Sequence, residues 1–185
     1  MIERRFRGRR TLTFSFADVF GPIPDVTTIV RVSVRLVTAL VIGGLIGLQR
    51  EMTHHSAGLR THILVSMGTA LLVICGQESG MSSGDVSRIV QGIVTGIGFL
   101  GGGAILKLTA EHEIRGLTTA AGIWMTAACG VAAGLGRVGV AIIGVLLALF
   151  VLVALRAFED RLGSHAHRSQ ESKQMGIDTQ DDADA

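Results

Sequence analysis

Polar side chains at the ends of apolar segments are the part of this sequence that could do chemistry. They combine guanidinium, carboxylate and hydroxyl groups: Arg50, Glu51, Arg60, Thr61, Arg115, Thr118 and Thr119. An ionised group at the edge of a hydrocarbon layer is costly unless it is paired or solvated, so such positions are functional candidates. Two of these groups would begin helices, whose amino termini present unpaired N–H groups and a partial positive charge. We therefore predict an anion-binding rim, for a phosphate, a lipid headgroup or a partner's carboxylate.

The same residues also have a structural interpretation. Glu51 could pair with Arg60 or Arg115 and so hold two helices together, since a buried ion pair often gives specificity rather than stability. Both interpretations stay open at this point. Replacing both arginines by alanine separates them, because full activity of that variant would exclude the anion site.

A metal site is a further alternative. Glu51, His54 and His55 fall at helical spacing, with His62 further along, and one carboxylate with two or three imidazoles could bind zinc. His54 and His55 fall in a short loop, however, where exposed histidines are common. Glu51 and Asp85 are expected at opposite membrane faces, so no carboxylate cluster for magnesium forms. We predict no metal and no cofactor.

Three more polar residues stand at the start of another apolar segment. Asp85 is expected to cap a helix and Arg88 to anchor its rim, at the face opposite to the first group. Gln91 would lie one turn inside the membrane, where an amide needs a partner. We predict that it makes an interhelical hydrogen bond.

The elements that must position these residues are membrane helices. With 48% hydrophobic residues, 25 glycines and only 17% charged residues, the chain of 185 residues is too apolar for a soluble domain. A helical span takes roughly 17 to 25 residues. Suitable runs cover residues 32–48, 59–75, 89–106, 117–135 and 138–155. We predict an all-α integral membrane protein with about five transmembrane helices in a glycine-rich bundle.

Glycines recur four residues apart within these spans, which places both members of a pair on one helix face. Such pairs let neighbouring backbones approach closely and favour a tight bundle or a homo-oligomer. The pairs are Gly43 with Gly47, Gly92 with Gly96, Gly98 with Gly102, and Gly130 with Gly134.

The two ends differ from the membrane domain at 32–155. Residues 1–31 are expected to form a basic, disordered arm, which could lie on anionic lipid headgroups; a start codon placed too far upstream is the alternative. Residues 156–185 are expected to be a polar, disordered tail. No folded basic module follows the arm, so nucleic-acid binding is not expected. Discounting the distant arm, the basic residues favour a cytoplasmic carboxyl terminus; a dominant arm would invert the topology.

No catalytic arrangement is present in the sequence. Gly101, Gly102 and Gly103 lie within an apolar helix and lack the strand and lysine of a phosphate-binding loop. Cys75 and Cys129 stand alone in apolar spans, so no disulfide is expected. We predict that the protein is not an enzyme.

The ordered motifs resemble those of the MgtC/SapB family of membrane proteins. They read Gly47-Leu48-Gln49-Arg50-Glu51, Ala57-Gly58-Leu59-Arg60-Thr61-His62, Arg88 with Gln91, Gly96 to Gly103, and Arg115 to Ala121 followed by Trp124. The resemblance covers about residues 32–155. It implies a multi-pass protein of the bacterial inner membrane, linked to growth at low magnesium, survival in macrophages and modulation of the ATP synthase.

Departures from the family pattern limit what carries over. Gln49 stands where the family usually has glutamate, which leaves Glu51 as the one acid of that motif. Gly102 replaces an alanine, and Val86 replaces a frequent proline. Some members also carry a soluble carboxyl-terminal domain, and this chain resembles the short members.

Two functions are therefore expected. The first is a small regulatory membrane protein that acts through membrane partners, including the ATP synthase by resemblance, in adaptation to low magnesium or related stress. The alternative is a subunit of an ion or anion transporter or channel. Few acidic groups are available in the bilayer to carry a cation, which favours the first.

Overall fold

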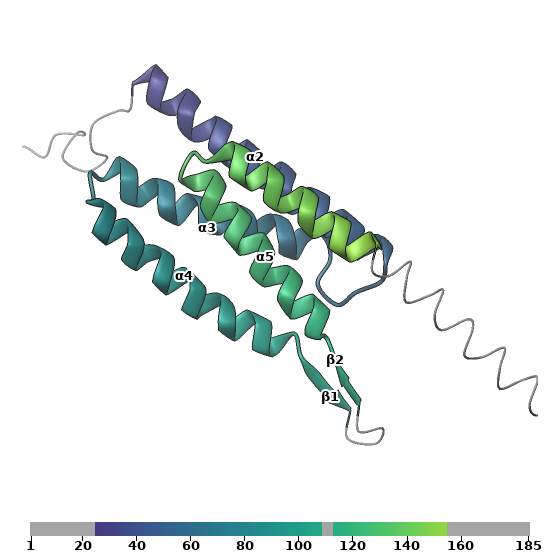
Figure 1. Ribbon diagram of the computed structural model, residues 1–185. Helices are drawn as coiled ribbons and strands as arrows, with labels where there is room; N and C mark the ends of the chain where they lie inside the picture. The colour runs from purple at the N-terminus through teal and green to yellow at the C-terminus, as the bar shows by residue number, and fades with distance from the viewer. Residues whose placement is uncertain (1–24, 109–112, 155–185) are drawn as a thin grey trace, which may run out of the picture.

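The computed structural model describes residues 25–108 and 113–154. Five helices account for most of this part of the chain: α2 (Val26–Met52), α3 (Leu59–Glu78), α4 (Ser83–Gly103), α5 (Leu117–Gly134) and a helix over Val138–Ala154. They lie side by side along one direction (Figure 1). The prediction of a helical membrane bundle is confirmed. The carboxyl-terminal tail predicted at residues 156–185 lies outside the described residues, as do the first 24 residues of the predicted amino-terminal arm.

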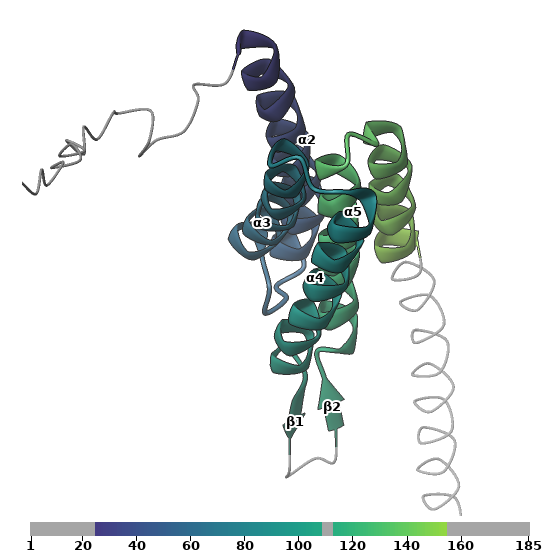
Figure 2. The same cartoon turned by 90° about the vertical axis from the view of Figure 1, so that its left-hand side faces the viewer.

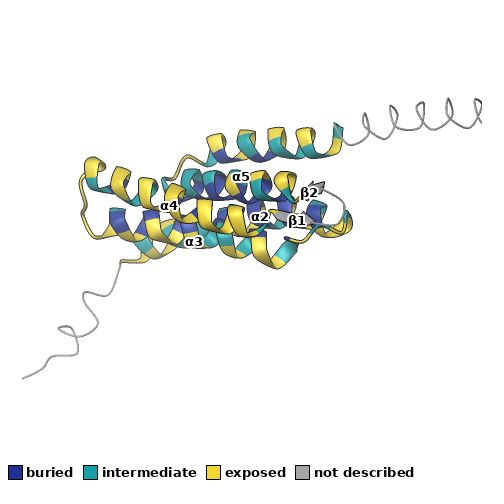
Figure 3. Ribbon diagram, turned by 90° about the horizontal axis from the view of Figure 1, so that it is seen from below, coloured by how far each residue is buried: buried dark blue, intermediate teal, exposed yellow. Residues whose placement is uncertain are grey.

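Three of these helices, α2, α3 and α5, are long and apolar enough to cross a membrane. The helix over Val138–Ala154 is shorter but also apolar. Figure 3 shows that exposed residues occupy the outer faces, while buried residues gather where the helices meet. Because many exposed side chains are aliphatic, such as Val34, Val41, Leu45 and Leu146, the outside of the bundle suits hydrocarbon.

The first helix begins earlier than predicted. α2 starts at Val26, six residues before the expected start at residue 32, so residues 26–31 are helical and not part of the expected disordered arm. Asp25 caps this helix, with its Oδ1 accepting from the backbone N–H of Thr28 at 3.2 Å. Hydrogen bonding from Thr28 also lowers the pKa of the Asp25 carboxyl. The cap and the apolar residues that follow it account for the earlier start.

The cap of α4 is also different from the prediction. Ser82, and not Asp85, is the capping residue, and its Oγ accepts from the Asp85 N–H at 3.3 Å. The Ser82 hydroxyl donates to Asp85 Oδ2 at 2.7 Å. The helix starts at Ser83, which places the carboxylate in the first turn, where a negative charge is favourable.

A short hairpin interrupts the expected all-helical order. α4 ends at Gly103, before the predicted residue 106, and β1 (Leu106–Leu108) pairs antiparallel with β2 (Glu113–Arg115). Gly116 then turns the chain into α5 with φ +95°, and a Cβ there would collide with the carbonyl of Ala104. The run of glycines at the end of α4 explains the early stop, since glycine is a poor helix former. The hairpin projects past one end of the bundle (Figure 2).

Two pairs of the predicted glycines lie at tight helix contacts. A Cβ added at Gly43 would be 2.6 Å from the His62 carbonyl oxygen, and one at Gly47 would be 2.8 Å from Leu59 Cα. Gly130 and Gly134 of α5 approach α3 in the same way; a Cβ at Gly134 would be 2.7 Å from the Ala70 carbonyl oxygen. These glycines bring α2 and α5 against the backbone of α3.

The glycines of α4 are placed differently. A Cβ added at any of the four would meet no atom within 4 Å: Gly92, Gly96, Gly98 and Gly102. Within the described chain, α4 therefore makes no close backbone approach through them. It packs against α5 and α3 chiefly through Val86, Ile93 and Ile97.

Candidate functional site

The end of the bundle where α2 stops and α3 and α5 begin carries the predicted rim. The structure separates its residues by burial. Arg50 and Thr119 are buried at 1% and 2% exposure, whereas the remaining side chains are exposed: Glu51, Arg60, Thr61, Arg115 and Thr118. The rim is thus divided into an interior pair and an outer set.

Arg50 points into the bundle from α2 to α5. Its Nη2 donates to Thr119 Oγ1 at 2.7 Å. Gly43, Gly47 and Arg50 share one face of α2, because residues four and seven positions apart line up on a helix. The face of α2 whose glycines contact α3 therefore also directs the Arg50 guanidinium into the bundle. A hydrogen bond from a charged donor is stronger than one between neutral groups.

Glu51 has a local role at the start of α3. Its Oε2 accepts from the backbone N–H of Leu59 at 3.0 Å. The carboxylate thus binds one of the N–H groups that have no partner within the first turn of α3. A Cβ at Gly58 would collide with this carboxylate, so a larger residue there would require the Glu51 side chain to move. Among the described residues Glu51 forms no ion pair with Arg60. The amino terminus of α3 is therefore partly filled by the chain's own anion.

A polar pocket of about 600 Å³ opens beside this contact. It is lined by Glu51, Gly58, Leu59, Arg60 and Thr61. Arg60 has no carboxylate of the described residues within ion-pair distance. The pocket presents one guanidinium, one hydroxyl and one carboxylate to its surroundings.

A second polar contact inside the bundle was not expected from the sequence. His62, fully buried on α3, lies with Nδ1 2.7 Å from Thr126 Oγ1 on α5. The Thr126 hydroxyl donates to the Gly122 carbonyl at 2.9 Å, so it accepts from the imidazole N–H. His62 Nε2 and Ser66 Oγ are buried with no hydrogen-bond partner in the described part of the chain. His62 Nε2 can accept one more hydrogen bond, and the Ser66 hydroxyl can donate or accept one.

This interior polar row could have been found from spacing. His62 and Ser66 are four residues apart on α3, and Thr119 and Thr126 are seven apart on α5, so each pair shares one face. The sequence interpretation considered His62 as a member of a family motif and in a metal site that it rejected, and did not predict this hydrogen bond. Within residues 25–108 and 113–154, no group of three or more His, Cys, Asp or Glu side chains lies together as a metal site would require.

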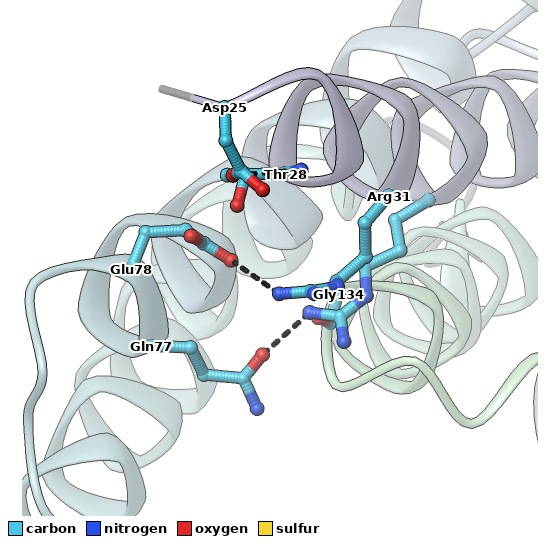
Figure 4. A network of polar contacts seen from close by, with 7 residues as sticks. Asp25, Thr28, Arg31, Gln77, Glu78 and Gly134 are labelled. Carbon is cyan, nitrogen blue, oxygen red and sulfur yellow. Dashed lines mark hydrogen bonds and ion pairs between the residues drawn. The ribbon is translucent and has the colours of Figure 1, made fainter. Parts of the chain in front are cut away.

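A third polar contact, also missed, lies at the opposite end (Figure 4). Arg35 Nη1 of α2 donates to Gln77 Oε1 at 2.6 Å and to the Gly134 carbonyl at 3.0 Å. Arg31 Nη1 lies 3.8 Å from Glu78 Oε1. Arg35 thereby joins three helices and satisfies a carbonyl at the carboxyl end of α5. Its role is structural.

The remaining predicted residues lie on the outside of α4. Arg88 Nη1 is 3.5 Å from Asp85 Oδ1, and both side chains are largely exposed, so this pair contributes little stability. Gln91 is exposed and makes no side-chain hydrogen bond to another described residue. The predicted interhelical bond of Gln91 is absent from the described chain because its face of α4 points away from α3 and α5.

Comparison with known proteins identifies the family. The MgtC family model matches residues 36–161. The chain belongs to the MgtC family. It is similar to SrpB of Synechococcus elongatus, at 39% identity over 69% of this chain and 76% of that protein. It is also 42% identical to the "Putative magnesium transporter YhiD" of Escherichia coli K12, over 70% of this chain and 62% of YhiD.

Relatives that carry the family's own name are longer. MgtC of Brucella abortus is 42% identical over 72% of this chain, and the match covers 55% of that protein. The chain thus spans little more than half of MgtC and about three fifths of YhiD. No solved structure matches the chain.

Proposed function

We propose that this member of the MgtC family is a small, non-enzymatic regulatory protein of the bacterial inner membrane. In this proposal it acts by contact with other membrane proteins during adaptation to limiting magnesium, and its carboxyl terminus is cytoplasmic. Family resemblance makes the ATP synthase the first partner to test. The homologues support the family but leave the role and the partner to experiment.

The position of the acidic groups carries the proposal. The carboxylates of the described side chains lie at helix ends: Asp25, Glu51, Glu78 and Asp85. The polar side chains buried inside are basic or neutral, and they include Arg50, His62 and Thr126. A magnesium path needs several oxygen ligands, preferably carboxylates, and a buried guanidinium repels a divalent cation. The described bundle therefore suits a packed scaffold better than a cation path.

The alternative function is transport, since the name of YhiD refers to magnesium transport. Flux measurements separate the two functions. The full-length protein, reconstituted alone in liposomes with a magnesium-sensitive dye inside, should give no flux above that of empty liposomes. Saturable flux that Arg50→Met alters would overturn the regulatory proposal.

A matched genetic test addresses the role in the cell. A deletion strain should grow poorly in limiting magnesium, and the wild-type gene should restore growth. Variants of the exposed rim, Arg60→Ala and Arg115→Ala, should lose rescue at equal membrane abundance, while Arg88→Ala at the opposite end should keep it. Rescue by all variants would show that the exposed rim is not the contact surface. Pull-down from the same strains then tests the ATP synthase directly.

A further inference from the structure

A long apolar groove runs between α3 and α4 on the outside of the bundle. It encloses about 760 Å³, a volume within the usual range of roughly 300 to 1,000 Å³ for ligand sites. Leu64 and Leu72 of α3 and Leu100 of α4 form its walls, and they are exposed at 70%, 54% and 47%. Ile93 and Ile97 are buried at its base.

Glycines keep this groove open. Gly68, Gly92 and Gly96 line it, and a Cβ added at any of them would meet nothing within 4 Å. α4 runs alongside α3 and α5 (Figure 2), but it lies against α3 less closely than α2 and α5 do. The space is therefore not filled by side chains of the described chain. An apolar ligand would fit the groove, because its atoms would make dispersion contacts with aliphatic side chains that otherwise have no neighbour on that side.

Along α3, the residues of the polar pocket directly precede those of the groove. Leu64 is one helical turn after Arg60 on the same face of α3, and Arg60 and Thr61 line the pocket with Glu51. An apolar groove and a site with one guanidinium and one carboxylate thus follow one another along α3. That order matches an amphiphile with an acyl chain and a headgroup that carries both charges.

We propose that this groove and pocket bind one aminophospholipid of the phosphatidylethanolamine type. One acyl chain lies between Leu64 and Leu72, the phosphate contacts Arg60, and the ammonium group lies at Glu51. The carboxylate selects the occupant: a purely anionic headgroup would face repulsion from Glu51, and an apolar helix of a second copy would leave the charged pocket unused. The inference is independent of the regulatory function, because a transporter could bind the same lipid.

The test uses the full-length protein in liposomes that contain a trace of phosphatidylethanolamine with a photoreactive group on its acyl chain. Cross-linked peptides are then mapped by mass spectrometry. Labels should concentrate on residues 64–72 and 89–100, above the level on the outward face of α2, which samples bulk lipid. Equal labelling of the two surfaces would overturn the proposal without any variant.

Matched variants examine each end of the site. Gly92→Leu places a side chain in the groove at a position where a Cβ meets nothing within 4 Å, and it should abolish the label. Gly98→Leu, where the Cβ is equally free but lies outside the groove, should not. Arg60→Gln should reduce labelling by up to about fivefold, the effect of one exposed ion pair. Arg88→Gln at the far end of α4 should leave it unchanged. Unfolding midpoints in detergent verify that each variant is folded.

Two further outcomes would also overturn the assignment. A photoreactive phosphatidylglycerol that labels the groove as strongly would refute the role of Glu51. Efficient disulfide formation between two chains carrying Gly92→Cys would show that a second copy occupies the groove.

Discussion

Replacing Gly43 by alanine tests whether close approach of α2 and α3 holds the bundle together. The new Cβ would lie 2.6 Å from the His62 carbonyl oxygen and 2.8 Å from Ile63 Cα. Ordinary van der Waals contact begins near 3.4 Å, so the two helices must part by about 0.8 Å. Both obstacles are backbone atoms, which cannot rotate away.

The energetic cost follows from this displacement. Overpacking a close contact costs about 1 to 3 kcal/mol, and the alanine recovers up to about 1 kcal/mol of helix propensity. With the full propensity gain, we expect Gly43→Ala to destabilise the protein by about 0 to 2 kcal/mol. The control is Gly98→Ala, where the Cβ meets nothing within 4 Å. It should be neutral or slightly stabilising.

The assay is reversible unfolding in mixed micelles, with the mole fraction of sodium dodecyl sulfate as the variable and helicity as the signal. The two variants should differ in the free energy of unfolding by at least about 1 kcal/mol. Indistinguishable values would refute the reasoning, because they would mean that the α2–α3 contact is loose enough to absorb a methyl group.

Other contacts give predictions of the same kind. A double-mutant cycle of His62→Phe and Thr126→Val should yield a coupling energy of about 0.6 to 1.7 kcal/mol, measured by the same unfolding assay, and zero coupling would contradict the hydrogen bond. Glu51→Ala should speed amide hydrogen exchange at the start of α3, whereas Glu51→Gln, which keeps an acceptor oxygen for Leu59, should change it less; equal rates in both would exclude the cap. Arg35→Met should lower the free energy of unfolding by about 1 to 3 kcal/mol, because it removes two hydrogen bonds at once, while Arg88→Met should stay within about 0.5 kcal/mol of wild type.

The apolar helices were predictable because a segment long and apolar enough for the hydrocarbon layer can be recognised from its own residues, without knowledge of its neighbours. The predicted start of α3 at residue 59 and of α5 at residue 117 agree with the structure, since Gly58 and Gly116 precede them. The apolar span predicted for α2 stops at residue 48, four residues before the helix ends at Met52. Because the helix continues to Met52, Arg50 is a helical residue whose direction is set by the face shared with Gly43 and Gly47.

Contacts between helices were harder to predict, for a physical reason. A polar residue in an apolar helix needs a partner, but spacing alone does not say which helix supplies it. His62 finds Thr126, whereas Gln91, which was expected to find a partner, lies on an outer face. The glycines show the same limit. Pairs four residues apart occur on α2, α4 and α5, but those of α2 and α5 meet a neighbouring backbone and those of α4 face open space.

The contacts of α2 and α3 also bear on the order in which the chain assembles. Of the described helices these two are synthesised first, and they are joined at one end by Glu51 with Leu59 and at the other by Arg31 with Glu78. The Thr126 hydroxyl that binds His62 belongs to α5. Thr126 is synthesised 64 residues after His62. A chain halted before α5 thus holds a helical hairpin whose imidazole lacks this hydroxyl in the bilayer.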